Sequence, residues 1–290
     1  MNYPQQQQAS GGRGGFGLMR LLPILFFGLY MGYYYLSHRD VVPVTGRKHL
    51  VDISREQEAA LGYQSYQEIL QNEHIVTTGE APKMVQDVAT RLIQAVQKFP
   101  GADPGFEWEA NVIESDQVNA FALPGGKIAV YTGLLPVAAN ADGLAVVMGH
   151  EIAHAVARHG AERMAYQKLV QIGSMAAGVS VGDMSPQARQ AVMAALGAGA
   201  KFGVLLPFSR DHESEADEMG LYFAAAACFD PREAPKLWER MAALGGAHPP
   251  EFASTHPSNE HRIEDLNRWM PKALEYRAQY CSDKAAERQP

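Results

Sequence analysis

The residues most suited to chemistry lie in one short stretch, His150-Glu151-Ile152-Ala153-His154, which has the pattern HExxH. Residues four apart on a helix lie on the same face, one turn apart. His150 and His154 can therefore direct both imidazoles at one metal ion, with Glu151 at the edge of that face. Two neutral nitrogen ligands and a carboxylate beside a metal-bound water are the groups that a zinc hydrolase needs.

The neighbours of this motif favour a metal site. The flanking stretch, residues 144–159, reads LAVVMGHEIAHAVARH, which is apolar and predicts a buried helix. Buried histidines and a buried glutamate cost free energy unless something pairs with them. We therefore predict one Zn²⁺ per subunit, against the alternative of two histidines on a charged, solvated helix face.

The third ligand is not part of a standard extended motif. A catalytic zinc site uses three protein ligands and leaves a fourth position for water. The pattern HExxHxxGxxH needs Gly at 157 and His at 160, but the chain has Ala157 and Gly160. His159 lies five residues past His154, so a continuous helix would turn it well away from the pair, and we expect a structural role for it.

Carboxylates further along the chain provide a candidate. The thermolysin-like pattern needs a glutamate about twenty residues after the second histidine, and the sequence has none there. The next carboxylates on a helical pattern lie in residues 209–217, SRDHESEAD. Glu213 and Asp217 are four apart and share a face, whereas Glu215 points elsewhere. We predict that Glu213 is the third ligand and that Asp217 orients a ligand imidazole; the alternative is a solvated, charged face.

Composition excludes some classes of partner. The 290 residues carry a net charge of -7 and no basic stripe, which argues against a nucleic-acid surface. The two cysteines, Cys228 and Cys281, are too few for a disulfide framework and lack the spacing of a zinc pair. One bridge between them would be possible in an oxidising compartment.

The N-terminus predicts a membrane anchor. Residues 1–15 are rich in Gln and Gly and read as a disordered tail. Residues 16–37 are apolar apart from Arg20, and the apolar run after Arg20 is slightly shorter than the roughly 20 residues that span a bilayer. The run of three tyrosines near its end suits a membrane–water interface. We predict an uncleaved transmembrane signal anchor, with a cleavable signal peptide or a buried core helix as alternatives.

Topology is less determined. No small-x-small cleavage site follows the apolar run, and no cysteine follows that would carry a lipoprotein anchor. Basic residues flank the segment almost equally, so the positive-inside rule leaves both orientations open. We place the chain in the bacterial inner membrane as a single-pass protein with a periplasmic catalytic domain, because anchors of exported proteins begin in this way.

The remaining patterns predict an α+β, mainly α-helical fold over residues 41–283, followed by a flexible tail at 284–290. Ser54 and Gln57 form a capping box that opens a helix to about position 71, and Pro82 opens a second helix to about position 98. Alternating polar and apolar residues between 107 and 131 predict a small antiparallel sheet with a hairpin beside the HExxH helix. Two Ala- and Gly-rich stretches, residues 169–182 and 191–208, are interpreted as core helices, with membrane-dipping segments as the alternative.

One strand of that sheet has a possible use. The free edge of the segment Asn119-Ala120-Phe121 can bind an extended peptide as an added strand. The alternative is that the hairpin only covers the core.

HExxH followed much later by SRxxExxAD resembles the zinc metallopeptidases of the family that includes the CAAX prenyl protease, the HtpX heat-shock protease and the beta-barrel assembly-enhancing protease. The resemblance runs from about residue 44 to about residue 280. It is carried as well by the segments PVTGR at 43–47, NAF at 119–121 with PGG at 124–126, and THPS at 255–258 with Arg262. The chain lacks the multiple hydrophobic spans of the prenyl protease and HtpX, which points to the single-anchor, soluble-domain branch with a zincin-like catalytic domain.

The resemblance implies roles for particular residues. Glu213 matches the third ligand of the family, and His256 with Arg262 matches a pair implicated in stabilising the oxyanion. Glu151 would be the general base, and Asn119 with the edge strand would hold the backbone of a protein or peptide substrate. This implies a zinc metalloendopeptidase that acts on envelope proteins in quality control. The alternatives are a chaperone or scaffold that binds unfolded envelope proteins with little turnover, a latent protease, and an aminopeptidase.

Overall fold

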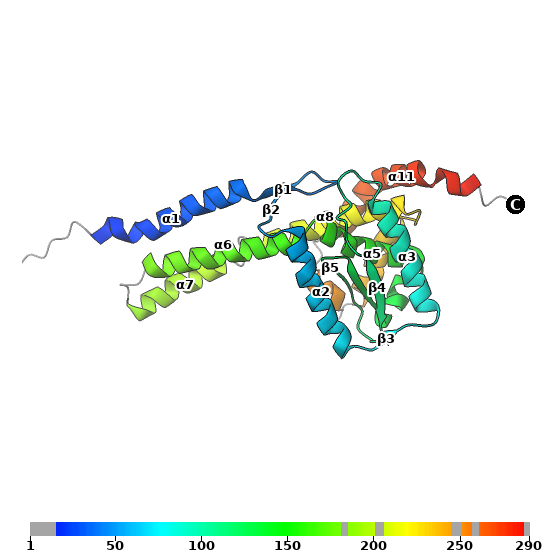
Figure 1. Cartoon of the computed structure of the whole chain (residues 1–290), viewed down its shortest axis with the longest axis horizontal. Coiled ribbons are helices and arrows are strands. Elements are labelled where there is room, and N and C mark those ends of the chain that lie inside the picture. Colours follow the sequence, from blue (N-terminus) through cyan, green and yellow to red (C-terminus); the bar gives the residue numbers. More distant parts are fainter. Residues whose placement is uncertain (1–15, 181–184, 201–205, 245–250, 257–260, 287–290) are drawn as a thin grey trace, which may run out of the picture. The chain divides into compact units, whose positions relative to one another are not determined.

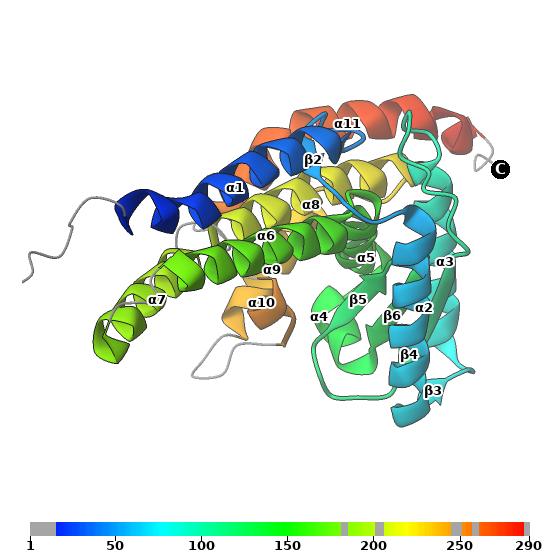
Figure 2. The ribbon, with the colours of Figure 1, turned by 60° about the vertical axis from the view of Figure 1, so that its left-hand side comes forward.

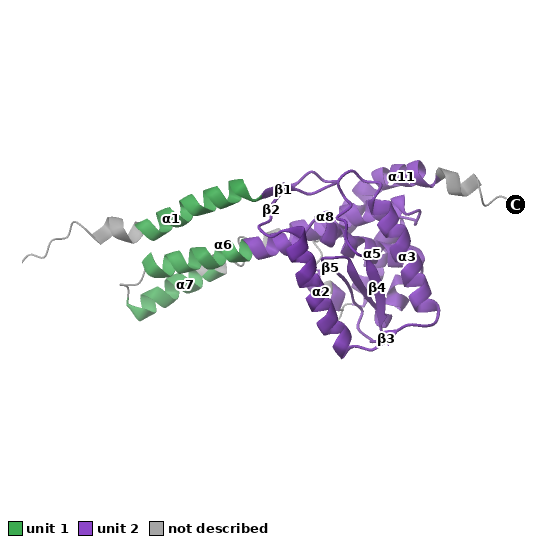
Figure 3. Ribbon diagram, in the orientation of Figure 1, with its two compact units in different colours: residues 1–38, 166–205 green, residues 39–165, 206–290 purple. Residues whose placement is uncertain are grey.

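The computed structural model divides the chain into two compact units (Figure 3). Unit 1 comprises Met1–His38 and Tyr166–Leu205, and unit 2 comprises Arg39–Ala165 and Leu206–Pro290. The residues that the structure describes are 16–180, 185–200, 206–244, 251–256 and 261–286. The predicted tail at 1–15 and the last four residues of the predicted tail at 284–290 lie outside them. Every candidate site residue belongs to unit 2.

Unit 2 is mainly helical and contains two small sheets (Figure 1). Its strands are β1 (Arg39–Val41), β2 (Lys48–Leu50), β3 (Ile75–Val76), β4 (Glu109–Ile113), β5 (Ala120–Leu123) and β6 (Lys127–Tyr131). Its helices are α2 (Arg55–Asn72), α3 (Glu80–Val96), the 3-10 turn η1 (Thr132–Leu134), α4 (Leu135–Ala138), α5 (Ala141–Val156), α8 (Leu206–Ala226), α9 (Glu233–Ala243), α10 (Glu251–Thr255) and α11 (Arg262–Ala286). Helix α6 (His159–Ser180) begins in unit 2 and continues in unit 1.

The first two helices of unit 2 form for the reasons that the sequence indicates. Ser54 caps α2 in a complete capping box, because its hydroxyl accepts from the Gln57 amide while the Gln57 side chain accepts from the Ser54 amide. Helix α3 has Pro82 in its first turn and buries one apolar stripe that includes Val85, Val88 and Leu92. Both predictions are confirmed.

The predicted sheet and hairpin lie beside the HExxH helix, but the sheet is mixed. Its strand order is β3-β4-β6-β5. β5 and β6 pair antiparallel around a turn in which Gly125 and Gly126 have φ of 84° and 86°, a backbone conformation that favours glycine. β4, however, pairs parallel with β6. β5 takes the edge of the sheet, so the neighbour of β4 is β6. The hairpin turn reverses the chain between β5 and β6, and β6 therefore runs parallel to β4.

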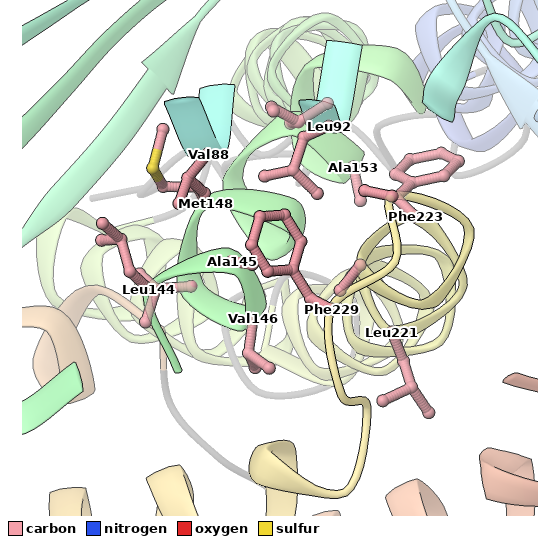
Figure 4. Packing of buried hydrophobic residues seen from close by; sticks show 14 of the residues in the cluster. Val88, Leu92, Leu144, Ala145, Val146, Met148, Ala153, Leu221, Phe223 and Phe229 are labelled. Atoms are coloured by element: carbon pink, nitrogen blue, oxygen red, sulfur yellow. The ribbon is translucent and has the colours of Figure 1, made fainter. Parts of the chain in front are cut away.

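The core of unit 2 is built around α5 (Figure 4). Leu144, Met148 and Ala153 of α5 belong to one core cluster with Leu92 of α3 and Phe223 of α8. The sheet contacts α5 through β5. Figure 2 shows α8 beside α5 along much of its length. Since α5 is surrounded in this way, nearly all of its residues are buried, as the apolar flanks of the motif predict.

Two glycines set the separation of α5 and α8. A Cβ added at Gly220 would lie 2.6 Å from the backbone nitrogen of His150, and one added at Gly149 would lie 2.9 Å from the carbonyl oxygen of Gly220. Contacts this short are not available to real Cβ atoms, so only glycine permits this approach of the two backbones. The glycine pair therefore positions the acidic helix against the histidine helix.

Cys228 and Cys281 form a disulfide, with 5.6 Å between their Cα atoms. The bridge joins the turn after α8 to the C-terminal part of α11. The pairing that the sequence left open is therefore present, and it closes a loop with a sequence separation of 53.

Unit 1 contains α1 (Phe16–Ser37), the rest of α6, and α7 (Pro186–Ala200). Within it, α1 and α6 approach closely at Gly173: a Cβ added there would lie 2.9 Å from the ring of Phe27. The prediction that residues 169–182 and 191–208 are core helices is wrong for the described part of these stretches. Past Leu169 their side chains are half-buried or exposed, with Val179 at 71%, because the small residues supply little apolar volume to bury and the helices fold with α1.

Among the described residues, no single helix has both the length and the hydropathy needed to cross a membrane. Thr132–Ala138 and Ala141–Val156 meet these criteria only when taken together, and they are bent by 120°.

We predict that Gly220→Ala destabilises the protein by about 1–3 kcal/mol, the usual cost of overpacking a core. The physical reason is the clash of the new methyl group with the backbone at His150. Urea unfolding followed by circular dichroism measures the change. Gly178→Ala is the control, because that helical glycine has open space around it and alanine there should be neutral or stabilising. Equal effects of the two substitutions would contradict the packing argument.

Candidate metal centre

Two helices bring the candidate ligands together. α5 begins at Asn140, whose side-chain oxygen accepts from the amide of Gly143, and it places His150 and His154 one turn apart on the same face. α8 places Glu213 opposite them. The Glu213 carboxylate lies 3.3 Å from Nε2 of His150 and 3.5 Å from Nε2 of His154.

A fourth group joins this cluster. His150, His154, Glu213 and His256 each present one ligand atom, and these atoms all lie within 4.8 Å of one another. Nδ1 of His256 lies 3.2 Å from Glu213, and its Nε2 lies 3.4 Å from Glu151. The sequence placed His256 near the site only through a family resemblance, and in the structure it lies inside the group of possible ligands.

The chemistry of this donor set fits a cation. The Nε2 atoms of His150 and His154 lie 3.0 Å apart and face a carboxylate in a buried site. Burial by itself lowers the pKa of His150, but its bonds to Asp217 and Glu213 outweigh burial and raise the pKa to about 9. The site therefore favours positive charge, and a metal ion at the meeting point of these atoms would supply it in place of a proton.

Asp217 and Arg262 lie behind His150. Nδ1 of His150 lies 2.9 Å from Asp217, and Arg262 binds the same carboxylate at 2.6 and 2.8 Å. The guanidinium also lies 3.4 Å from the centre of the Trp238 ring. Burial would raise the pKa of Asp217, but the charge of Arg262 and the bond to His150 outweigh it and lower the pKa. Asp217 is thus a carboxylate that accepts from Nδ1 and leaves Nε2 of His150 free.

A cavity of about 290 Å³ opens onto this cluster. Its lining includes Glu151, His154, Glu213, His256 and, from β5, Phe121. Burial raises the pKa of Glu151. Its Oε1 is buried and makes no hydrogen bond within the described residues, and it lies 3.4 Å from Nε2 of His256. A buried carboxylate oxygen that makes no hydrogen bond and lies next to a cavity is available to a water molecule or a substrate.

The other predicted residues lie at different distances from this cavity. Arg262 is not part of its lining. It reaches the site through Asp217, through the carbonyl oxygen of His256 at 3.4 Å, and through the Glu213 carboxylate, 3.5 Å from its guanidinium. Asn119 precedes β5, and its side chain accepts from the amide of Ala120, whose own side chain is buried. Of the three residues of the predicted substrate strand, only Phe121 lines the cavity.

The expectation that His159 faces well away from the motif is wrong. Helix α5 ends at Val156, Arg158 has a positive φ of 59°, and α6 begins at His159 itself. The helical phase is therefore broken, and His159 returns toward His154, with 2.8 Å between their Nδ1 atoms. Glu215 does point away from the cluster, and it binds Nε2 of His159 at 2.9 Å. No local sequence signal marks this break, because neither Pro nor Gly occurs between 150 and 159.

Comparison with known proteins agrees with this geometry. The model of peptidase family M48 matches residues 81–270. The chain belongs to peptidase family M48. This M48 chain is 38% identical over 247 residues to the mitochondrial metalloendopeptidase OMA1 of Schizosaccharomyces pombe, covering 83% of the chain and 69% of that relative.

Two further relatives show how far the similarity extends. The chain is 33% identical to the mitochondrial metalloendopeptidase OMA1 of Homo sapiens, over 87% of the chain and 49% of the relative, so it spans about half the length of that protein. It is 34% identical to the beta-barrel assembly-enhancing protease of Escherichia coli, over 53% of the chain and 32% of the relative. With the family and these relatives, the M48 chain is a metalloendopeptidase.

Proposed function

We propose that this chain is a zinc-dependent endopeptidase that cuts envelope proteins during quality control. The observation that carries the proposal is the meeting of His150, His154 and Glu213 in one buried cluster, beside the Oε1 of Glu151, which makes no hydrogen bond in the described part of the chain. These three residues would hold the metal. Zinc bound there would act as a Lewis acid on the substrate carbonyl and lower the pKa of the attacking water to about 7.

The proton transfers would fall to Glu151. It lies in the cavity wall, and its raised pKa favours a carboxylate that can take up and release a proton. Glu151 would accept the proton of the water as it attacks the peptide carbonyl. It would then deliver that proton to the leaving amine.

His256 would stabilise the negative charge that develops on the carbonyl oxygen, because it lines the same cavity. Arg262 does not line the cavity, so it would act through the groups that its guanidinium contacts: Asp217, Glu213 and the carbonyl oxygen of His256. In this proposal His256 contacts the oxyanion directly, whereas Arg262 does not.

The edge strand supports the choice of an extended peptide as substrate. β5 bonds toward β6 through Asn119, which accepts from the Tyr131 amide, and through Leu123, which accepts from the Gly126 amide. Because bonding directions alternate along an antiparallel strand, the backbone groups of Ala120 and Ala122 point to the other edge. There the Ala120 amide already donates to the Asn119 side chain and the Ala122 amide to Glu151, so the two carbonyl oxygens are the groups that a substrate strand would bond. A substrate strand added there would lie beside the cavity that Phe121 lines.

A latent protease is the second candidate, and one observation favours it. His256 offers a fourth ligand atom to the cluster, where it would compete with water.

We further propose that α1 is a single-pass anchor in the bacterial inner membrane, with unit 2 in the periplasm. The exposed apolar side chains of α1 support this: Leu25, Phe26, Leu29 and Leu36 are each at least 57% exposed. The name of the Escherichia coli relative, a protease of beta-barrel assembly, supports envelope proteins as substrates.

Two substitutions test the zinc assignment. Glu151→Gln should keep stoichiometric zinc and lose nearly all cleavage of casein, because it removes only the proton acceptor. Glu213→Ala should lose the zinc itself, because it removes a ligand. Metal analysis of the purified variants, with chelator-sensitive casein degradation by the unchanged chain as the reference, measures both. A Glu213→Ala protein with full zinc occupancy would overturn the ligand set.

Substitution of His256 separates the two roles proposed for it. We expect His256→Ala to lower the turnover number by roughly 10²–10³, the usual effect of removing an oxyanion donor. An increase in turnover would instead support the latent form. His261→Ala is the control, because that histidine, five residues after His256, is exposed and does not line the cavity.

Deletion of residues 1–37 tests the anchor. The shortened chain should move from the membrane pellet to the soluble fraction on ultracentrifugation, because the exposed apolar face of α1 is removed. If it stays in the pellet, membrane attachment does not depend on α1, and the exposed side chains of α6 become the next segment to test.

A further inference from the structure

Among the residues that the structure describes, His159 is the one buried histidine beside a proposed ligand that the mechanism above does not use. Its ring is 2% exposed and lies between two partners. On one side, its Nδ1 is 2.8 Å from Nδ1 of His154. On the other, its Nε2 is 2.9 Å from Oε2 of Glu215. These two contacts determine where the protons lie.

Within the described residues, every hydrogen-bond partner of the Glu215 carboxylate other than His159 is a donor. Nε of Arg47 donates to Oε2 at 2.8 Å, and the hydroxyl of Thr45 donates to Oε1. An ionised carboxylate held by a guanidinium can only accept. Nε2 of His159 must therefore carry the proton that it shares with Glu215.

The proton on Nε2 settles the other contact. A neutral imidazole that donates through Nε2 can only accept through Nδ1. Nδ1 of His154 must then be the donor across the 2.8 Å contact, so the lone pair of His154 is on Nε2. Nε2 is also the atom of His154 that faces His150 and Glu213 in the candidate metal centre.

We propose that His159 is a positioning residue for His154, which selects the tautomer whose Nε2 binds the metal. This inference rests on the proposed zinc site. Asp217 has the corresponding role for His150, because it accepts directly from Nδ1 of that residue. For His154, the imidazole of His159 lies between Nδ1 and the carboxylate of Glu215. Both ligand histidines are thus held from behind by a carboxylate of α8.

The orientation of the His159 ring is itself held by neighbours. It stacks on the ring of His212, with centroids 4.1 Å apart and an interplanar angle of 10°. His212 binds Glu162 at 2.9 Å, and Arg47 binds Glu162 as well as Glu215. Arg47 and Thr45 come from the connection between β1 and β2, so this N-terminal segment reaches the metal site through Glu215 and His159.

Three substitutions in the whole chain test the proposal. In His159→Asn, the side-chain oxygen can still accept near Nδ1 of His154, while the contact with Glu215 is lost. In His159→Gln, the amide can still donate to Glu215, while the acceptor for His154 is lost. His159→Leu loses both contacts. The affinity for Zn²⁺ is measured by competition with a chromophoric chelator, and thermal melting with the chelator in excess reports folding.

We expect His159→Gln and His159→Leu to bind Zn²⁺ about 10- to 100-fold more weakly, the usual effect of losing an outer partner of a ligand histidine. His159→Asn should lose less than either. A purely structural role predicts the reverse order, because Gln preserves the contact with Glu215. His74→Leu is the control: that exposed histidine pairs with Glu114 and has no part in the Glu162–Arg47–Glu215 network, so it should leave the affinity unchanged.

The order of the variants decides the outcome. The inference is overturned if His159→Gln binds as tightly as the unchanged chain, or if His159→Asn binds no better than His159→Leu. If His159→Leu does not fold, the comparison of Asn with Gln still decides. If the unchanged chain binds no zinc, the proposed function fails and this inference fails with it. If the unchanged chain binds zinc and the His159 variants bind it equally tightly, this inference alone fails.

Discussion

The close approach of α5 and α8 is the constraint on which the rest of the site depends. Gly149 and Gly220 let the two backbones come nearer than any side chain with a Cβ would allow. At this separation, a carboxylate on the short side chain of Asp217 reaches Nδ1 of His150, and Glu213 reaches both Nε2 atoms. A larger spacing would leave these carboxylates buried without partners, which costs several kcal/mol for each charge.

Burial explains why so many charged groups surround the cluster. Charged side chains are stable in a protein interior only when opposite charges and hydrogen bonds replace water. Arg262 does this for Asp217, and Arg47 does it for Glu215 and Glu162. The pKa of Glu215 accordingly falls to about 2: burial raises it, but His159, Arg47 and Thr45 outweigh burial. The outer network thus keeps Asp217 and Glu215 of α8 ionised, as acceptors for the imidazoles of His150 and His159.

Much of this arrangement could be predicted from local patterns. HExxH and the spacing of Glu213 and Asp217 depend only on helical periodicity, and the structure brings all of these side chains together. The helices that begin at Ser54 and near Pro82 likewise follow from short-range capping signals. What could not be predicted depends on contacts distant in sequence. The parallel pairing of β4 with β6 depends on which strand takes the sheet edge, and the role of the glycine pair depends on which helix faces α5.

The position of His159 shows a different limit, because the missing information is local but not visible in the residue types. Periodicity predicts directions only while a helix continues, and α5 stops at Val156 without a Pro or Gly to mark the end. The break is stabilised from outside the helix: Arg158, at positive φ, binds Glu58 at 2.7 Å and the carbonyl oxygen of Ile53 at 2.7 Å. These contacts compensate for a backbone conformation that is unfavourable for a non-glycine residue.

The tertiary structure around α2 therefore determines the direction of a side chain next to the metal site. The contact between His159 and His154 thus depends on residues about 100 positions earlier in the chain, which no pattern within the HExxH segment encodes.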